Sequence, residues 1–189
     1  PDSLDVISMM YPAELAAFEL VDMQTVHAKG TKVVYTISFD KIQKEYTEKV
    51  KEGTETGSFD TYLKSEMDKQ IGYAGSFDGM ITEYKGNNPI YMSAEQKAEA
   101  KKYQDIFFSA VLTWKTANAD KLLTFQGYPE NLIEQTILTN CKHIILATDN
   151  VTDDAQLSVF ARLAMAAAGV PTDRFVVAVS TASLDASDK

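Results

Sequence analysis

Residues 77–86 read Phe77-Asp78-Gly79-Met80-Ile81-Thr82-Glu83-Tyr84-Lys85-Gly86. The apolar centre of this stretch is typical of a short buried strand, and such a strand carries charge only where the charge has a partner or a task. Because alternate side chains of a strand share a face, we expect Ile81, Glu83 and Lys85 on one face. The sequence therefore predicts an acid and a base side by side near the carboxyl end of this strand.

Two interpretations of the Glu83 and Lys85 pair are open at this point. Active sites lie at the carboxyl ends of parallel strands, both in barrels and in open sheets, so the pair could belong to a functional site. The two residues could equally form an internal ion pair, or lie where the strand ends in solvent. The local sequence favours neither interpretation over the other.

Composition limits the classes of partner. The chain has 189 residues, of which 45% are hydrophobic, and a net charge of −9. This length and hydrophobic content suit one globular domain. The negative charge argues against nucleic acids and anionic membranes as partners, since both require clustered Lys and Arg. No apolar run approaches the roughly 18 residues of a membrane span.

The sequence has no recognisable metal or cofactor site. Cys141 is the single cysteine, which excludes an internal disulfide, and neither His27 nor His143 has a spacing typical of metal ligands. A nucleotide-binding open sheet usually has a glycine-rich turn after its first strand, whereas the turn here is Met10-Tyr11-Pro12-Ala13. We therefore expect neither a metal nor a cofactor.

Apolar runs alternate with helical patterns along the whole chain. Strands are expected at residues 4–10, 31–39, 77–85, 121–126, 141–148 and 174–182. Helices are expected at residues 13–29, 58–72, 93–118 and 152–169, with a short segment at 130–139. Residues 40–57 are expected to form a polar connection. Such alternation indicates a parallel α/β fold, either an open doubly wound sheet or part of an eight-stranded barrel.

The order and spacing of these segments resemble glycoside hydrolase family 18, the chitinases and endo-β-N-acetylglucosaminidases. The stretch that begins at Asp78-Gly79 resembles the family motif DGxDxDxE on the fourth barrel strand. Thr36-Ile37-Ser38-Phe39 occupies the place of the SxGG motif, and Leu146-Ala147-Thr148-Asp149 resembles the MxYD motif. The whole chain is similar to the family 18 proteins of Bacteroides that carry degenerate forms of these motifs.

The resemblance implies an architecture and a location. The fold would be a (β/α)8 TIM barrel, seen here as roughly six β/α units that correspond to barrel strands 2 to 7. Residues 1–189 would then form a single barrel domain that lacks the first and last strands, with the missing parts supplied by the same chain. The resemblance also implies an extracytoplasmic location, in the periplasm or at the cell surface.

The chain departs from the family at the catalytic position. The resemblance implies a substrate-assisted mechanism, in which the last Glu of the motif protonates the glycosidic oxygen and the substrate's acetamido oxygen attacks the anomeric carbon. Aligned on Asp78-Gly79, Ile81 and Glu83 take the inner Asp positions, and Lys85 takes the position of the catalytic Glu. An ordinary lysine has a pKa of about 10.4, and its ammonium group would repel the developing oxocarbenium charge. Glu83 lies roughly 6–7 Å deeper along the strand.

Three functions follow from these observations. The first is binding of glycans that contain N-acetylglucosamine, with impaired or no hydrolysis because Lys85 replaces the catalytic Glu. The second is an active endo-β-N-acetylglucosaminidase or chitinase-like hydrolase, with Glu83 as a displaced acid or with an acid from another loop. The third is an unrelated α/β domain that binds a nucleotide or a phosphate.

The candidate site residues were chosen because they lie near strand ends, or because they have an aromatic or polar side chain that can contact a sugar. Glu83 is the candidate catalytic residue. The candidates for substrate binding are Asp78, Lys85, Tyr35, Gln126, Tyr128 and Asp149, and Tyr84, Tyr91 and Asn87 are further candidates. For each aromatic residue, ordinary packing in the core is the alternative role.

Overall fold

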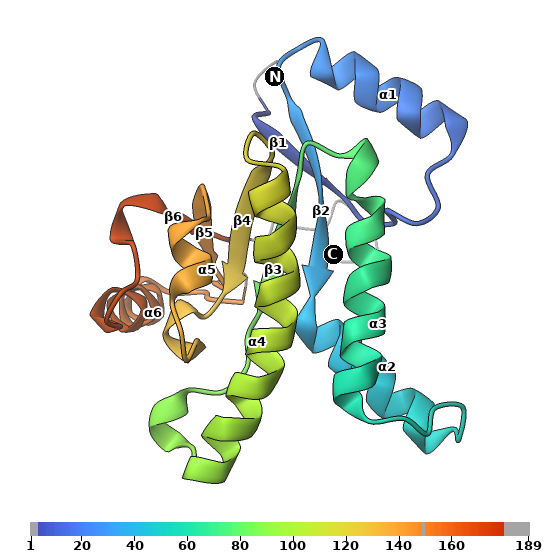
Figure 1. The fold of residues 1–189 in the computed structure, drawn as a ribbon. Coiled ribbons are helices and arrows are strands. Elements are labelled where there is room, and N and C mark those ends of the chain that lie inside the picture. Colours follow the sequence, from blue (N-terminus) through green and yellow to red (C-terminus); the bar gives the residue numbers. More distant parts are fainter. Residues whose placement is uncertain (1–3, 149, 180–189) are drawn as a thin grey trace, which may run out of the picture.

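The computed structural model describes residues 4–148 and 150–179 of the chain. A six-stranded sheet runs through these residues, and the strands lie side by side in the order of the sequence. They are β1 (Val6–Met9), β2 (Lys32–Ser38), β3 (Gly79–Tyr84), β4 (Leu122–Gly127), β5 (His143–Leu146) and β6 (Phe175–Val177). All neighbouring pairs are parallel. The prediction of parallel strands separated by helices is confirmed (Figure 1).

The connections between the strands are helical. The helices are α1 (Ala17–His27), α2 (Phe39–Lys51), α3 (Phe59–Ile71), α4 (Ala94–Ala117), α5 (Thr136–Thr139) and α6 (Asp154–Ala166). Within the described ranges, none of these helices combines the length and the apolar character that crossing a membrane requires.

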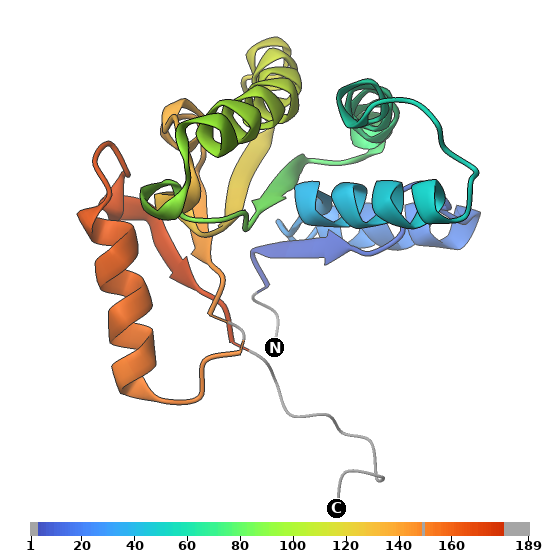
Figure 2. The ribbon, with the colours of Figure 1, turned by 90° about the horizontal axis from the view of Figure 1, so that it is seen from below.

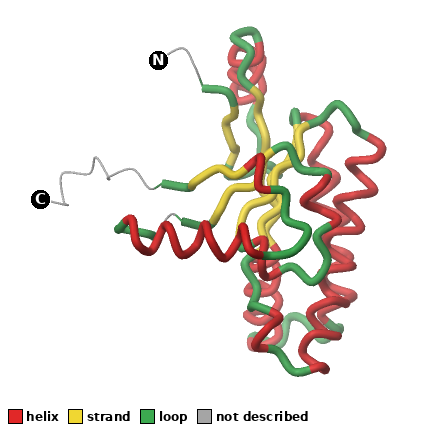
Figure 3. The backbone as a smooth tube through the Cα atoms, turned by 90° about the vertical axis from the view of Figure 1, so that its left-hand side faces the viewer, coloured by secondary structure: helices red, strands yellow, loops and turns green. Residues whose placement is uncertain are grey.

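The sheet is curled into a partial barrel. Figure 2 shows the strands curving around an open side, with α3, α4 and α5 on the opposite, convex side. Figure 3 shows the strands gathered beside these helices from another direction. A doubly wound sheet would carry helices on both faces, and sequential strand order with this curvature is instead that of a (β/α)8 barrel. The chain therefore forms six consecutive units of a TIM-type barrel.

Helix α2 corrects one prediction. Residues 40–57 do not form only a polar connection, because Phe39–Lys51 are helical. The Ser38 side chain accepts a hydrogen bond from the Lys41 N–H and so caps this helix. Phe39 and Ile42 are buried, and Tyr46 packs against the core. The apolar residues thus recur at helical spacing, but the many Lys and Glu residues between them concealed the pattern.

Strands β5 and β6 cover half or less of their predicted ranges. Strand β5 covers residues 143–146 of the predicted 141–148, and β6 covers 175–177 of the predicted 174–182. Residues 180–182 of the latter prediction lie outside the described part of the chain. Short strands in these places still pair in parallel with their neighbours, so the topology is unaffected.

The main core lies between the convex face of the sheet and the helices. Tyr35 of β2, Phe125 of β4 and Phe107 of α4 are completely buried there. Aromatic rings pack edge to face in this layer, for example Phe39 against Phe107 with centroids 5.6 Å apart. Such burial of large apolar side chains supplies most of the favourable free energy of folding.

Close approach of β3 to β4 explains why residue 79 is glycine. A Cβ atom at Gly79 would overlap the backbone carbonyl of Leu122. We expect Gly79→Ala to lower the free energy of unfolding by at least about 2 kcal/mol, because one of the two strands must shift. Urea unfolding followed by circular dichroism measures this loss. Gly75→Ala is the matched control, since a Cβ there meets no atom within 4 Å; equal stabilities of the two variants would contradict the prediction.

The ionisation of Cys141 makes the free energy of unfolding depend on pH in the alkaline range. Burial raises the pKa of its thiol from 9.0 to about 12. The folded state therefore favours the neutral thiol, so its contribution to stability is complete below pH 9 and declines as the pH rises toward 12, by up to roughly 4 kcal/mol. We expect the stability of Cys141→Ala to fall less steeply between pH 9 and 11 than that of the wild type, measured by urea unfolding. Parallel pH profiles would contradict this expectation.

Candidate functional site

The strand register places a row of side chains on the concave face near the carboxyl ends of the strands. Ser38 pairs with Glu83, Glu83 with Gln126, and Gln126 with Ile145. Because residues in register point to the same face, these four side chains lie next to one another across four strands. We call them the concave row. It lies where active sites lie in parallel barrels.

Glu83 and Lys85 interact within this region. The Glu83 Oε1 atom lies 3.9 Å from Lys85 Nζ and accepts a hydrogen bond of 3.5 Å from Gln126 Nε2. The Glu83 side chain is only 14% exposed, whereas that of Lys85 is 41% exposed. Glu83 and Lys85, which the sequence placed on one face, thus form an ion pair, and this pair lies at the open concave end of the sheet. Because Lys85 reaches solvent, its ammonium group remains available to a ligand.

The backbone around Lys85 is fixed by two side chains from other elements. The Asp40 carboxylate accepts a hydrogen bond of 2.9 Å from the Lys85 N–H. The Asn131 amide donates to the carbonyl oxygens of Lys85 and Gly86, at 2.7 and 3.1 Å. These bonds satisfy backbone groups that the end of β3 would otherwise leave unpaired. Sequence reasoning missed Asp40 and Asn131, because their roles depend on contacts some 45 residues away.

A buried glutamine connects α4 to this turn. Gln104 donates to the Tyr84 hydroxyl at 2.9 Å and to the Asn131 carbonyl at 3.3 Å, and it accepts from the Ile133 N–H at 2.9 Å. Burial raises the pKa of the Tyr84 phenol, which therefore stays protonated at neutral pH. Tyr84 is part of this network on the convex side and not a sugar platform on the concave row.

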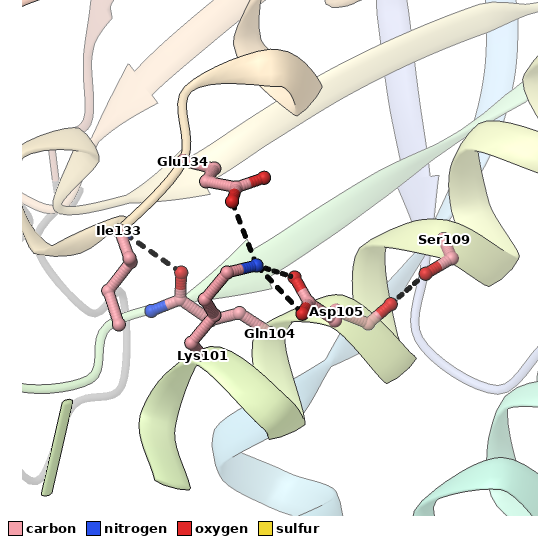
Figure 4. A network of polar contacts seen from close by, with 6 residues as sticks. All are labelled: Lys101, Gln104, Asp105, Ser109, Ile133 and Glu134. Carbon is pink, nitrogen blue, oxygen red and sulfur yellow. Dashed lines mark hydrogen bonds and ion pairs between the residues drawn. The ribbon is translucent and has the colours of Figure 1, made fainter. Parts of the chain in front are cut away.

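Charged residues of α4 reinforce the same junction. Lys101 Nζ lies 2.8 Å from carboxylate oxygens of both Asp105 and Glu134 (Figure 4). Figure 4 also shows the bond between Gln104 and Ile133 just beside this cluster. The segment that follows β4 is thus attached to α4 by polar contacts on two successive turns of the helix.

Two predicted binding residues lie away from the concave row. Tyr35 has an exposed fraction of 0%, and its hydroxyl donates to the Gln70 carbonyl at 2.9 Å on the helix side of the sheet. Its register partner is Met80, which has the opposite orientation to Glu83 on β3. The prediction that Tyr35 stacks on a sugar is corrected by this placement: its side chain belongs to the core.

Asp78 lies at the other end of β3. Its Oδ2 atom accepts a 2.7 Å hydrogen bond from the Val33 N–H and lies 2.6 Å from His27 Nε2, and Lys32 Nζ lies 3.7 Å from Oδ1. Five residues separate it from Glu83, or about 16 Å along an extended strand. The expectation of a binding role is therefore also corrected: Asp78 joins β2, β3 and α1 at the amino end of the sheet.

The remaining candidates are distributed around the carboxyl ends of the strands. Tyr128 follows β4 and stacks on Phe160 of α6, with centroids 5.8 Å apart and an interplanar angle of 18°. Asn87 and Tyr91 line a separate cavity beyond the end of β3. Asp149 lies outside the described residues. The neighbouring Thr148 is buried, and its hydroxyl donates to the Ala178 carbonyl at 2.9 Å.

A metal centre is not found in the described part of the chain. Within residues 4–148 and 150–179, no group of three or more His, Cys, Asp or Glu side chains could hold a metal ion. The concave row offers the carboxylate of Glu83, the carboxamide of Gln126 and the hydroxyl of Ser38, and the ammonium group of Lys85 lies beside it. Such groups are suited to hydrogen bonding with the hydroxyl and acetamido groups of sugars.

The Gln104 network can be tested by stability. We expect Gln104→Leu to lower the free energy of unfolding by about 2–4 kcal/mol, because the buried partners on Tyr84, Asn131 and Ile133 lose their hydrogen bonds while the volume is nearly kept. Chemical denaturation measures this change. Gln156→Leu, at an exposed position of α6, is the control and should be close to neutral. A Gln104→Leu protein as stable as this control would show that the network is dispensable.

Comparison with known proteins supplies the family. The family model described as "Glycoside hydrolase family 18, BT1044-like" matches residues 1–189. One similar solved structure is PbGH5A, a glycoside hydrolase family 5 enzyme from Prevotella bryantii B14, with 11% sequence identity and a TM-score of 0.43. The match covers 90% of the present chain but only 61% of that one. A search of curated proteins finds no match.

The family match argues against the alternative of an unrelated nucleotide-binding or phosphate-binding domain. The family match extends over the whole length of the sequence, and the curled parallel sheet has the architecture that the resemblance implied. The chain belongs to glycoside hydrolase family 18, and within it to the BT1044-like group.

Proposed function

We propose that this protein binds glycans that contain N-acetylglucosamine on the concave face of the barrel, and that it hydrolyses them poorly or not at all. Membership in a carbohydrate-active family supports a glycan as the ligand. The partly exposed polar groups of the concave row, Glu83 and Gln126, would bind hydroxyl or acetamido groups of the sugars. Tyr128, half-buried beyond the end of β4, would lie at the edge of this site.

The observation that carries the proposal is the Lys85 ammonium group, 3.9 Å from the Glu83 carboxylate. By the resemblance, Lys85 holds the position of the catalytic Glu. An ammonium group beside the glycosidic bond opposes the positive charge that develops on the anomeric carbon. Glu83 is held by both Lys85 and Gln126, deeper along β3, where it would serve as a hydrogen-bond acceptor for sugar hydroxyls.

We also propose that further units of the same chain complete the barrel. Strands β1 and β6 are the edges of the described sheet, and the concave side between them carries no helix (Figure 2). Val6 and Val176 on these edge strands are each more than a third exposed. Further barrel units from the same chain would pair with these edges and cover this apolar surface. An extracytoplasmic location, where complex glycans are met, completes the proposal.

Binding and turnover can be measured on one substrate. We expect the full chain to bind N,N′,N″-triacetylchitotriose saturably, with no release of shorter sugars above the uncatalysed background. Glu83→Gln and Gln126→Leu should each weaken binding by about five- to tenfold, because each removes a polar contact from the concave row. Calorimetry gives the affinity, and chromatography of the products gives the turnover.

Glu48→Gln is the matched control for this experiment. It makes the same chemical change at an exposed position of α2, where Glu48 forms only an i,i+4 ion pair with Lys44. We expect its affinity to equal that of the wild type. Efficient cleavage that Glu83→Gln abolishes would contradict the proposal, as would the absence of saturable binding.

One observation favours the active hydrolase as a second candidate. Glu130, in the segment after β4, has a buried Oε2 atom without a hydrogen-bond partner among the described residues. Burial raises the pKa of this carboxyl group, which is the direction that a general acid requires. If the intact protein cleaves the trisaccharide and Glu130→Gln removes this activity, the acid comes from this loop instead of from Glu83.

A further inference from the structure

A cavity lies on the other side of β3 from the concave row. It has a volume of about 480 Å³ and is lined by residues of α2, of segment 86–92 and of the first turns of α4. Its inner wall includes Tyr84, whose side chain points to the convex side, opposite to that of Glu83. In Figure 1, segment 86–92 and the start of α4 extend beyond the carboxyl ends of the strands. A volume of this size is typical of sites for small ligands.

The cavity lies away from the open edges of the described sheet. Strand β3 lies in the middle of the sheet, with β2 and β4 on either side, whereas the open edges are β1 and β6. Additional strands can pair only at those edges, so they would not take the place of the residues that line the cavity.

The rim of the cavity carries unused hydrogen-bonding groups. The side chains of Gln43 and Asn87 have no hydrogen bonds to any described residue. Asn88 and Gln96 use only their carbonyl oxygens, which accept from the Ile90 and Ser93 N–H groups, so their NH₂ groups remain free to donate. Four carboxamides thus offer donors, and two of them also offer acceptors, around one hollow.

Aromatic side chains supply the apolar contact. Tyr91 is 88% exposed, although it lines the cavity. The inner wall is rigid, because Phe39 packs on Tyr84 with ring centroids 5.0 Å apart. An exposed aromatic ring, packed rings and carboxamides that line one cavity suit a sugar: the exposed ring would stack on the apolar face of the pyranose, and the amides would bond its hydroxyls.

The charge of the lining restricts the class of ligand. Among the described residues, Glu99 is the only carboxylate that lines the cavity, and it accepts a hydrogen bond of 3.2 Å from the Tyr103 hydroxyl. The described lining contains no Lys or Arg. Phosphates, sulfates and acidic sugars would meet a carboxylate without a compensating cation, so a neutral ligand is favoured.

We propose that this cavity is a second carbohydrate-binding site, specific for neutral sugars and separate from the concave row. This inference rests on the proposed function only for the class of ligand, because the cavity has other lining residues than the concave row and lies on the other side of the sheet. A second site on the outer surface would bind a remote part of a long or branched glycan, or a second glycan chain, while the concave row binds another part of the glycan. The two sites together would raise the avidity for such glycans.

The test compares two neighbouring exposed residues in the full chain. Tyr91→Ala removes the stacking ring, and Ile90→Ala removes an equally exposed side chain, 80% accessible, that does not line the cavity. Calorimetric titration with N,N′,N″-triacetylchitotriose and with mannotriose should show two classes of site in the wild type. We expect Tyr91→Ala to weaken the class assigned to the cavity by about fivefold or more, and Ile90→Ala to stay within about twofold of the wild type.

The amides provide a second, independent variant. The double variant Gln43→Ala with Asn87→Ala keeps Tyr91 but removes two free carboxamides, and we expect the same class of site to weaken. Because these side chains make no hydrogen bonds to the described residues, the fold should be unaffected, which circular dichroism checks. Unchanged titrations for both Tyr91→Ala and this double variant would overturn the second site.

The outcomes separate this inference from the proposed function. If Gln126→Leu weakens one class of binding, while Tyr91→Ala and the double variant leave both classes unchanged, the concave row binds and the second site falls. If Tyr91→Ala weakens binding and Gln126→Leu does not, the second site stands and the concave row falls. Binding of a proline-rich peptide, but of neither sugar, in the Tyr91 cavity would overturn the carbohydrate assignment.

Discussion

The alternation of side chains along β3, fixed by parallel pairing on both of its sides, is the constraint on which the rest of the structure depends. Glu83 points to the concave face because its neighbours in register are Ser38 and Gln126. Tyr84, the next residue, must then point to the helices, where it meets Gln104. A shift of one residue would bury the carboxylate among aromatic rings and expose the phenol, at a large cost in solvation.

This alternation also divides the chemistry of the molecule. The concave side carries the carboxylate, ammonium and carboxamide groups of Glu83, Lys85 and Gln126. The convex side carries the aromatic core and, at its outer limit, the cavity beside Tyr91. Lys85 lies between these two sides, where the chain leaves β3. Its backbone N–H bonds the Asp40 carboxylate and its carbonyl accepts from the Asn131 amide, so these hydrogen bonds fix the backbone from which Lys85 and the start of segment 86–92 extend.

Sequence reasoning succeeded where the signal was local or periodic. The six strands and four of the helices were predicted near their observed positions, and the placement of Glu83 and Lys85 on one face followed from the two-residue period of a strand. It failed for α2, whose short apolar stripe lies among charged residues, and for Tyr35 and Asp78. The aromatic side chain of Tyr35 is compatible with either face of the sheet, and the structure places it in the core. Asp78 was assigned a binding role because it belongs to the family motif, although it lies at the amino end of β3.

The amino-acid sequence alone indicates a parallel α/β chain that resembles family 18 and has a lysine near a strand end, because hydrophobic period, helix caps and motif spacing can be read along the chain. The curl of the sheet, the support of the turn after β3 by Gln104 and Asn131, and the cavity lined by Gln43, Asn87 and Tyr91 become visible in the folded structure. These features join residues that are far apart along the chain. Their contacts arise from packing of whole elements, which no local pattern encodes.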